Sequence, residues 1–169
     1  LYYCEAAAAR YAELGIPEDI LLATLGDLRL WTDLWSAIKG ELYLGELAWL
    51  RFHLDLALFK VGRLQFQLSS FGKDYPAHGI RAGEGALAVH IDSSAPLTDE
   101  ACGRSFLLAK DFFATYFKDF SYSYFTCHSW LLDEELEAVL KKESNILAFS
   151  RRFTKLEAHP SEAIVKYVF

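Results

Sequence analysis

Residues 62–70, GRLQFQLSS, mark the point at which the hydrophobic period of the chain changes. Within them, leucine and phenylalanine alternate with arginine and glutamine, and this period of two is typical of a strand with one buried face. Before Gly62 the apolar residues recur at spacings of three and four, which indicates helices. The change predicts a helical region over residues 1–62, part of or packed on the same domain, and a sheet with helices over residues 63–169.

Downstream of this strand the sequence predicts a mixed sheet interrupted by helices. Further strands are expected over residues 86–91 (ALAVHI), over 122–132 (YSYFTCHSWLL), where aromatic residues favour a central strand, and over 145–156. A helix over 98–117 should begin at its threonine, a good N-cap followed by two acidic residues. A shorter helix is expected over 134–142. This order of elements assigns the chain to the α/β (α+β) class.

The helical region is expected to hold three helices. They cover residues 2–14, residues 17–39 with Gly26 as a candidate break, and residues 46–59. Tryptophans punctuate this region at spacings of three or four. We interpret them as core, or as a surface that packs against a further helical N-terminal domain, rather than as a ligand site.

Composition limits the classes of partner. The 169 residues are 53% hydrophobic, enough to form a core without disulfide or metal staples, and one compact unit is the default for this length. The formal net charge is -6, without a basic stripe, which argues against nucleic acid as a partner. No run of apolar residues is long enough to span a bilayer, so no membrane is expected.

The cysteines and the start of the chain bear on its setting. Three cysteines stand far apart without a CxxC pair, which fits reduced thiols and predicts a cytoplasmic protein. The sequence opens at Leu1 and contains no methionine, so an upstream domain is expected. The five histidines show no metal-ligand spacing, and no metal is expected.

Several segments, in order along residues 26–153, resemble a known family. They are LRLWTDLW, GELAWLRFHLDLALFKVGRLQFQL, VHID, PLTDEAC, FTCHSWLLD and SNILAFSRRF. Together they resemble the GNAT-like C-terminal domain of bacterial acyltransferase-domain proteins. The resemblance implies a GNAT-like mixed sheet flanked by helices, whose two central parallel strands splay apart and admit acyl-coenzyme A. It also implies an acyl-coenzyme A-dependent acyltransferase that acts on an amine acceptor, and a helical domain ahead of the sheet.

Three residues near the predicted strand ends are candidates for catalysis. His90 ends the strand over 86–91, and an imidazole there can act as a general base toward an amine. Cys127 and His128 are adjacent in the next strand, so they point to opposite faces, and either one can face the cleft with His90 if the two strands are parallel neighbours. The alternatives are a hydrogen-bonded structural histidine and a small buried cysteine.

The loop after residue 91 is the expected coenzyme site. The resemblance places the coenzyme pyrophosphate in residues 92–103 (DSSAPLTDEACG) and implies coenzyme contacts at Ile91, Thr98 and Ala101. This loop has no glycine before its last residue and carries three acidic side chains, which compete with an anion for the helix N-terminus. The alternative function is therefore a non-catalytic binding or interaction module that keeps the GNAT fold without its pyrophosphate loop.

Overall fold

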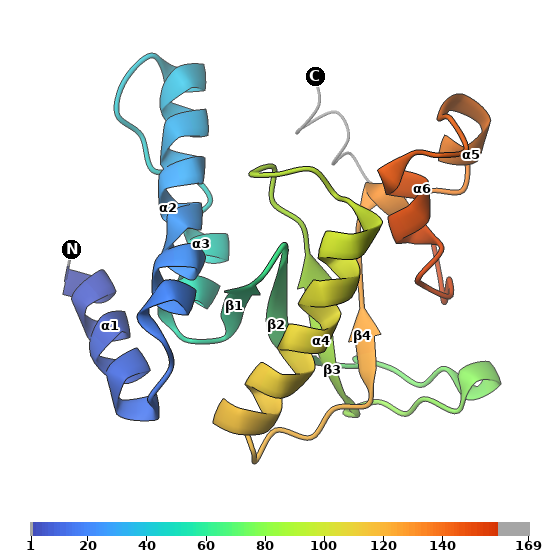
Figure 1. Cartoon of the computed structure of the whole chain (residues 1–169), viewed down its shortest axis with the longest axis horizontal. Helices are drawn as coiled ribbons and strands as arrows, with labels where there is room; N and C mark the ends of the chain where they lie inside the picture. The colour runs from blue at the N-terminus through green and yellow to red at the C-terminus, as the bar shows by residue number, and fades with distance from the viewer. Residues whose placement is uncertain (1, 159–169) are drawn as a thin grey trace.

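The computed structural model describes residues 2–158, and it shows helices followed by a mixed four-stranded sheet. Three helices come first: α1 (Tyr2–Leu14), α2 (Glu18–Lys39) and α3 (Leu47–Leu54). They lie together at one end of the molecule, next to the edge strand of the sheet (Figure 1). The predicted α+β class is confirmed.

The sheet is built from a meander and one parallel strand. Its strands are β1 (Leu58–Val61), β2 (Leu64–Ser70), β3 (Gly85–His90) and β4 (Tyr124–Thr126), in the spatial order β1-β2-β3-β4. The first two pairings are antiparallel, and β4 runs parallel to β3. The expectation that the strands around His90 and Cys127 are parallel neighbours is therefore confirmed.

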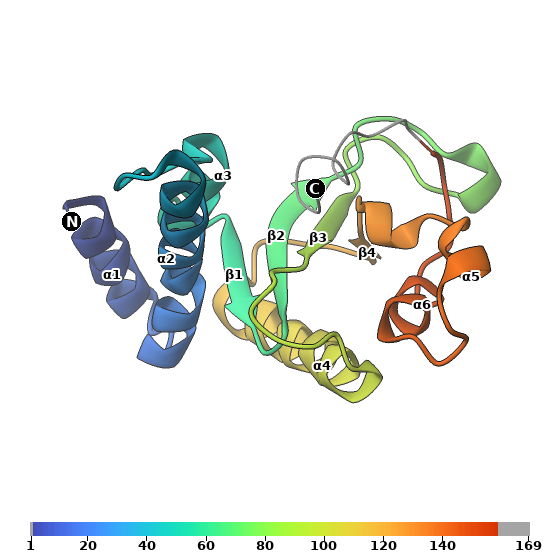
Figure 2. The ribbon, with the colours of Figure 1, turned by 90° about the horizontal axis from the view of Figure 1, so that it is seen from above.

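Helix α4 (Asp99–Tyr116) connects the two parallel strands and covers one face of the sheet (Figure 2). Leu64 and Phe66 of β2 and Leu87 of β3 are fully buried in the core on this side. The predicted N-cap is present, because the Thr98 hydroxyl accepts a hydrogen bond from the Ala101 N–H at 3.3 Å. The opposite face carries the polar residues of β2, and these define the candidate site.

Two predicted elements end earlier than expected. The helix expected over 46–59 stops at Leu54, because Leu56 adopts a left-handed conformation (φ 57°) and the chain then enters β1, a strand that periodicity missed. The strand expected over 122–132 is only β4. Beyond it the Ser129 hydroxyl accepts from the Leu131 N–H and starts the short 3₁₀-helix η2 (Trp130–Leu132).

The C-terminal elements are helical instead of extended. The strand predicted over 145–156 is wrong: α6 (Asn145–Ser150) occupies its first half, because Ser144 caps the Ile146 N–H and Leu147 and Phe149 pack inward. The helix expected over 134–142 shortens to α5 (Leu136–Val139). A further 3₁₀-helix, η1 (Pro76–His78), lies in the loop between β2 and β3.

The helices predicted over 2–14, 17–39 and 98–117 are confirmed, and α2 continues through Gly26 without a break. The division of the chain near residue 62 stays a prediction. Within residues 2–158, no helix is both long and apolar enough to cross a bilayer.

A buried hydroxyl on α4 fixes the turn between β1 and β2. Ser105 is fully buried, and its Oγ accepts hydrogen bonds from the N–H groups of Arg63 (2.6 Å) and Leu64 (3.2 Å). A Ser105→Ala variant leaves both donors unpaired, so we expect the free energy of unfolding to fall by about 2 kcal/mol. Urea unfolding measures the loss. The exposed Ser93→Ala is the control, and an equal loss in both variants would contradict the account.

Candidate functional site

The parallel strands stop pairing before β3 ends. The register of β3 with β4 runs from Ala86 opposite Tyr124 to Ala88 opposite Thr126, whereas β3 stays paired with β2 as far as His90. Beyond Ala88, β3 therefore continues without its parallel neighbour. Ligand sites of open α/β sheets lie outside such carboxyl ends of parallel strands.

His90 lies at this end on the polar face of the sheet. Its Nε2 is 2.9 Å from the Gln67 Oε1 of β2, and its ring meets the Trp49 ring of α3 edge to face, with centroids 4.7 Å apart. Burial, and then the nearby charge of His53, lower the pKa of His90 to about 4. His90 is therefore neutral at physiological pH.

A buried acid and a second histidine lie on the other side of the Trp49 ring. His53 of α3 is fully buried, and its Nε2 is 2.9 Å from the Asp27 Oδ2 of α2. The Asp27 side chain is only 4% exposed. His53 Nδ1 lies 3.3 Å from the Trp49 carbonyl oxygen. Both imidazole nitrogens thus face oxygen atoms.

One carboxylate oxygen of Asp27 accepts hydrogen bonds from side chains of two helices. The indole N–H groups of Trp31 (3.2 Å) and Trp49 (3.0 Å) both donate to Oδ2, the same oxygen that His53 approaches. Burial alone would raise the pKa of Asp27, but the hydrogen bonds from His53 and Trp49 and the charge of His53 outweigh it, and the pKa is lowered. The side-chain amide of Gln65, a buried residue of β2, also lowers the pKa of Asp27. Asp27 is therefore a buried carboxylate held in one orientation.

This arrangement has the parts needed for general base catalysis. A carboxylate beside an imidazole fixes the orientation of the ring and stabilises a positive charge on it, as in acid–histidine pairs of hydrolases. Here Asp27 and His53 form the pair, and the neutral His90 lies one ring away toward the strand end. Because both nitrogens of His53 face oxygen atoms and the His90 Nε2 faces Gln67, the nitrogen left to accept a substrate proton is the His90 Nδ1.

Of the other two candidate catalytic residues, Cys127 lies on the opposite face of the sheet from His90. Cys127 follows β4 and packs against the core on the α4 side of the sheet, away from the His90 face. Burial raises the pKa of its thiol to about 12, so the nucleophilic thiolate is not formed at neutral pH. His128 is exposed. The structure therefore does not bring Cys127 together with His90.

The three predicted coenzyme contacts surround the start of α4. Ile91 is the first residue after β3, and its side chain packs against the core. Thr98 and Ala101 hydrogen-bond to each other as the N-cap, so the Ala101 N–H already has a partner within the chain. Only part of the helix N-terminus is thus available to an anion.

Two of the three acidic residues of the loop over 92–103, Asp92 and Asp99, are paired with cations. The Asp92 side chain is buried, 2.7 Å from Lys60 Nζ and 3.5 Å from Arg63 Nη1. Arg152, which follows α6, contacts both the side chain and the carbonyl oxygen of Asp99. The negative charge expected to repel a pyrophosphate is therefore largely neutralised at these two positions.

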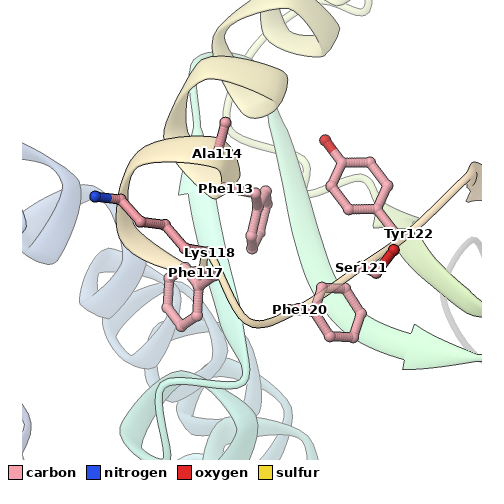
Figure 3. Close-up of a pocket in the computed structure, with 7 residues that line it drawn as sticks. All are labelled: Phe113, Ala114, Phe117, Lys118, Phe120, Ser121 and Tyr122. Atoms are coloured by element: carbon pink, nitrogen blue, oxygen red, sulfur yellow. The ribbon is translucent and has the colours of Figure 1, made fainter.

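A shallow pocket of about 360 Å³ lies far from these groups. Figure 3 shows it between the C-terminal end of α4 and the following loop, with Phe113, Phe117, Phe120 and Tyr122 around it and the Lys118 side chain turned outward. This loop passes the first residue of β3, since Ser123 N–H donates to the Gly85 carbonyl oxygen. His90 is at the other end of that strand. Across residues 2–158, no three His, Cys, Asp or Glu side chains gather as a metal site.

Sequence reasoning missed Asp27 and His53. Both stand inside amphipathic helices, and neither belongs to a motif. One signal was present: Asp27 falls between the apolar positions of α2, four residues before Trp31 and therefore on the same side of the helix. The tryptophans interpreted as core or as a partner surface are half-buried, and two of them hold the carboxylate.

Two family models match the chain. A family model described as the GNAT-like C-terminal domain matches residues 58–169, and one described as the N-acyltransferase N-terminal domain matches residues 1–56. No curated protein matches the chain.

Solved structures of acyltransferases have the same fold. The crystal structure of an acyltransferase in complex with decanoyl-CoA is 29% identical, with a TM-score of 0.87 over 99% of this chain and 51% of that one. The complex of an acyltransferase with decanoyl-CoA and teicoplanin is 29% identical, with a TM-score of 0.83 over 94% of this chain and 47% of that one. The chain thus has the fold of an acyl-CoA-dependent N-acyltransferase and spans about half the length of the structures it matches.

Proposed function

The chain belongs to the family of the GNAT-like C-terminal domain, and on this premise we propose that it transfers an acyl group from acyl-coenzyme A to an amine acceptor. The observation that carries the proposal is the buried Asp27–His53 pair, with His90 beside it, at the carboxyl end of β3. The family supplies the coenzyme and the reaction class, and the side chains supply the proton transfer.

The proposed reaction is direct transfer. The amine nitrogen attacks the thioester carbonyl carbon, a C–N bond forms, and the C–S bond breaks with coenzyme A leaving as the thiolate. The proton lost by the amine passes to a histidine, and then to the thiolate. Backbone N–H groups at the strand end, beginning at Ile91, stabilise the oxyanion of the tetrahedral intermediate.

We assign the base to His90. Both nitrogens of His53 already face oxygen atoms, whereas His90 faces Gln67 Oε1 with its Nε2 and keeps Nδ1 for the amine proton. The pKa of His90, about 4, keeps the ring unprotonated at neutral pH and so able to accept a proton. The buried Asp27–His53 pair supports the His90 ring through Trp49, which contacts all three residues.

The coenzyme is placed at the start of α4, near Thr98 and Ala101. Support comes from the neutralised acids Asp92 and Asp99, which leave room for an anion at the helix N-terminus. One observation favours the alternative of a non-catalytic module: the Ala101 N–H is already bonded to Thr98. Binding of the coenzyme separates the two functions.

Decanoyl-CoA, the ligand in the matching structures, is the first probe. A ligand that binds only the folded chain raises its apparent stability, so at about 100 times the dissociation constant we expect the melting temperature to rise by about 5–10 °C. Acetyl-CoA tests the acyl length, and free decanoate is the control for binding of the chain alone. No shift with millimolar coenzyme esters would contradict the enzyme function and favour the non-catalytic module.

The predicted helical partner domain stays a prediction. We expect such a domain to cover exposed apolar side chains of α2, of the loop that follows it and of the start of α3. They are Leu22, Leu34, Ile38, Leu42, Leu44 and Leu47. Apolar patches of this kind mark interaction sites in folded proteins.

A further inference from the structure

Trp49 contacts Asp27, His53 and His90 at once. The Trp49 indole N–H donates to Asp27 Oδ2 at 3.0 Å, and its carbonyl oxygen lies 3.3 Å from His53 Nδ1. Its ring meets the His53 ring at 5.3 Å and the His90 ring at 4.7 Å, both edge to face. One residue therefore touches the proposed base and both members of the buried pair beside it.

We propose that Trp49 is a positioning residue of the acyl-transfer site, which holds the Asp27 carboxylate against His53 and fixes the separation of the two histidine rings. The inference rests on the proposed function, because it assigns a role within the same site. Trp49 does not touch the reacting atoms in this assignment; it acts through Asp27 and His90.

The fold explains why Trp49 can position these groups. Trp49 lies in α3, whereas Asp27 lies in α2 and His90 in β3, so its contacts join three elements. Trp31 donates to the same carboxylate oxygen, but from α2 itself, four residues after Asp27. This bond from Trp31 thus orients Asp27 relative to α2. The contact from Trp49 sets Asp27 relative to the helix that bears His53.

Removing the N–H alone separates the hydrogen bond from the packing. Trp49→Phe keeps an aromatic ring and loses the donor, so the ionised form of Asp27 is less stabilised. We expect the pKa of Asp27, followed through its carboxyl carbon by NMR, to rise by about one unit. Trp49→Ala also removes the ring and should in addition shift the ring signals of His90. Trp35→Phe, a tryptophan of α2 that packs on Tyr43 and Gly45 instead, is the matched control.

Kinetics then test the role in the reaction. With decanoyl-CoA and a primary amine such as glucosamine, Trp49→Phe should lower kcat about tenfold, because misplaced catalytic groups reduce rate rather than binding. The KM for decanoyl-CoA should stay unchanged, and Trp35→Phe should match the unmodified chain. An unchanged pKa of Asp27, or an unchanged kcat, in Trp49→Phe would overturn the inference.

A separate binding measurement shows whether the proposed function itself fails. The unmodified chain is first tested for binding of decanoyl-CoA, which does not involve Trp49 in this account. If it does not bind, the enzyme function fails, and the role of Trp49 in acyl transfer falls with it. If it binds and turns over, only the variants decide about Trp49.

Discussion

A His90→Gln variant is expected to transfer acyl groups about a thousandfold more slowly than the unmodified chain, within the range that a general base contributes. The reason is geometric: His90 ends β3, and its Nε2 faces Gln67 Oε1 at 2.9 Å, which leaves Nδ1 to accept the proton of the amine. Glutamine retains a polar side chain of similar reach but cannot accept and hold a proton near neutral pH. The measurement is the release of coenzyme A thiol from decanoyl-CoA in the presence of glucosamine or lysine as acceptor.

A second variant tests the buried pair beside this base. Asp27→Asn keeps the shape of the side chain but removes the charge that His53 and Trp49 hold in place, so it should lower kcat less than His90→Gln does. His78→Gln changes an exposed histidine of η1 and should leave kcat unchanged. If His90→Gln folds normally, binds decanoyl-CoA and retains its rate, the base is a different group.

The sequence located the strand end but not the acid–histidine pair, and the reason is physical. Period-two alternation placed Leu64 and Phe66 on one face and Gln65 on the other, and the fold follows that assignment. Likewise, His90 was predicted at the end of a strand and lies there. These features depend on neighbours within a few residues, which periodicity can detect.

The pair itself depends on the packing of elements that are distant in the chain. Asp27 and His53 are 26 residues apart and meet only because α2 and α3 pack together beside the sheet. In the sequence, an acidic residue among apolar helical positions reads as solvent-exposed, and only its partners in the fold show that it is buried. The last predicted strand failed for a local reason instead: the apolar run after Ser144 fits a strand by composition, but its serine cap and buried Leu147 and Phe149 fit a helix.

The stability of the chain should fall steeply as the pH is lowered from 6.5 to 4, and His90 is the expected cause. Burial, and then the charge of His53, lower the pKa of His90 from 6.5 to about 4 in the folded chain. Between these two values the unfolded chain binds a proton that the folded chain does not. Stability therefore rises with pH through this window, and is lost as the pH falls.

The expected loss is about 3 kcal/mol at pH 4 relative to pH 7, since one pKa unit corresponds to about 1.36 kcal/mol. Asp27 and Asp92, whose pKa values are lowered, contribute only as the pH falls further, through the range in which carboxylates take up protons. Urea unfolding at closely spaced pH values measures the slope, and His90→Gln should flatten it between pH 4 and 6.5. The exposed His78→Gln should keep the slope of the unmodified chain. If His90→Gln keeps the full slope, another group carries the pH dependence.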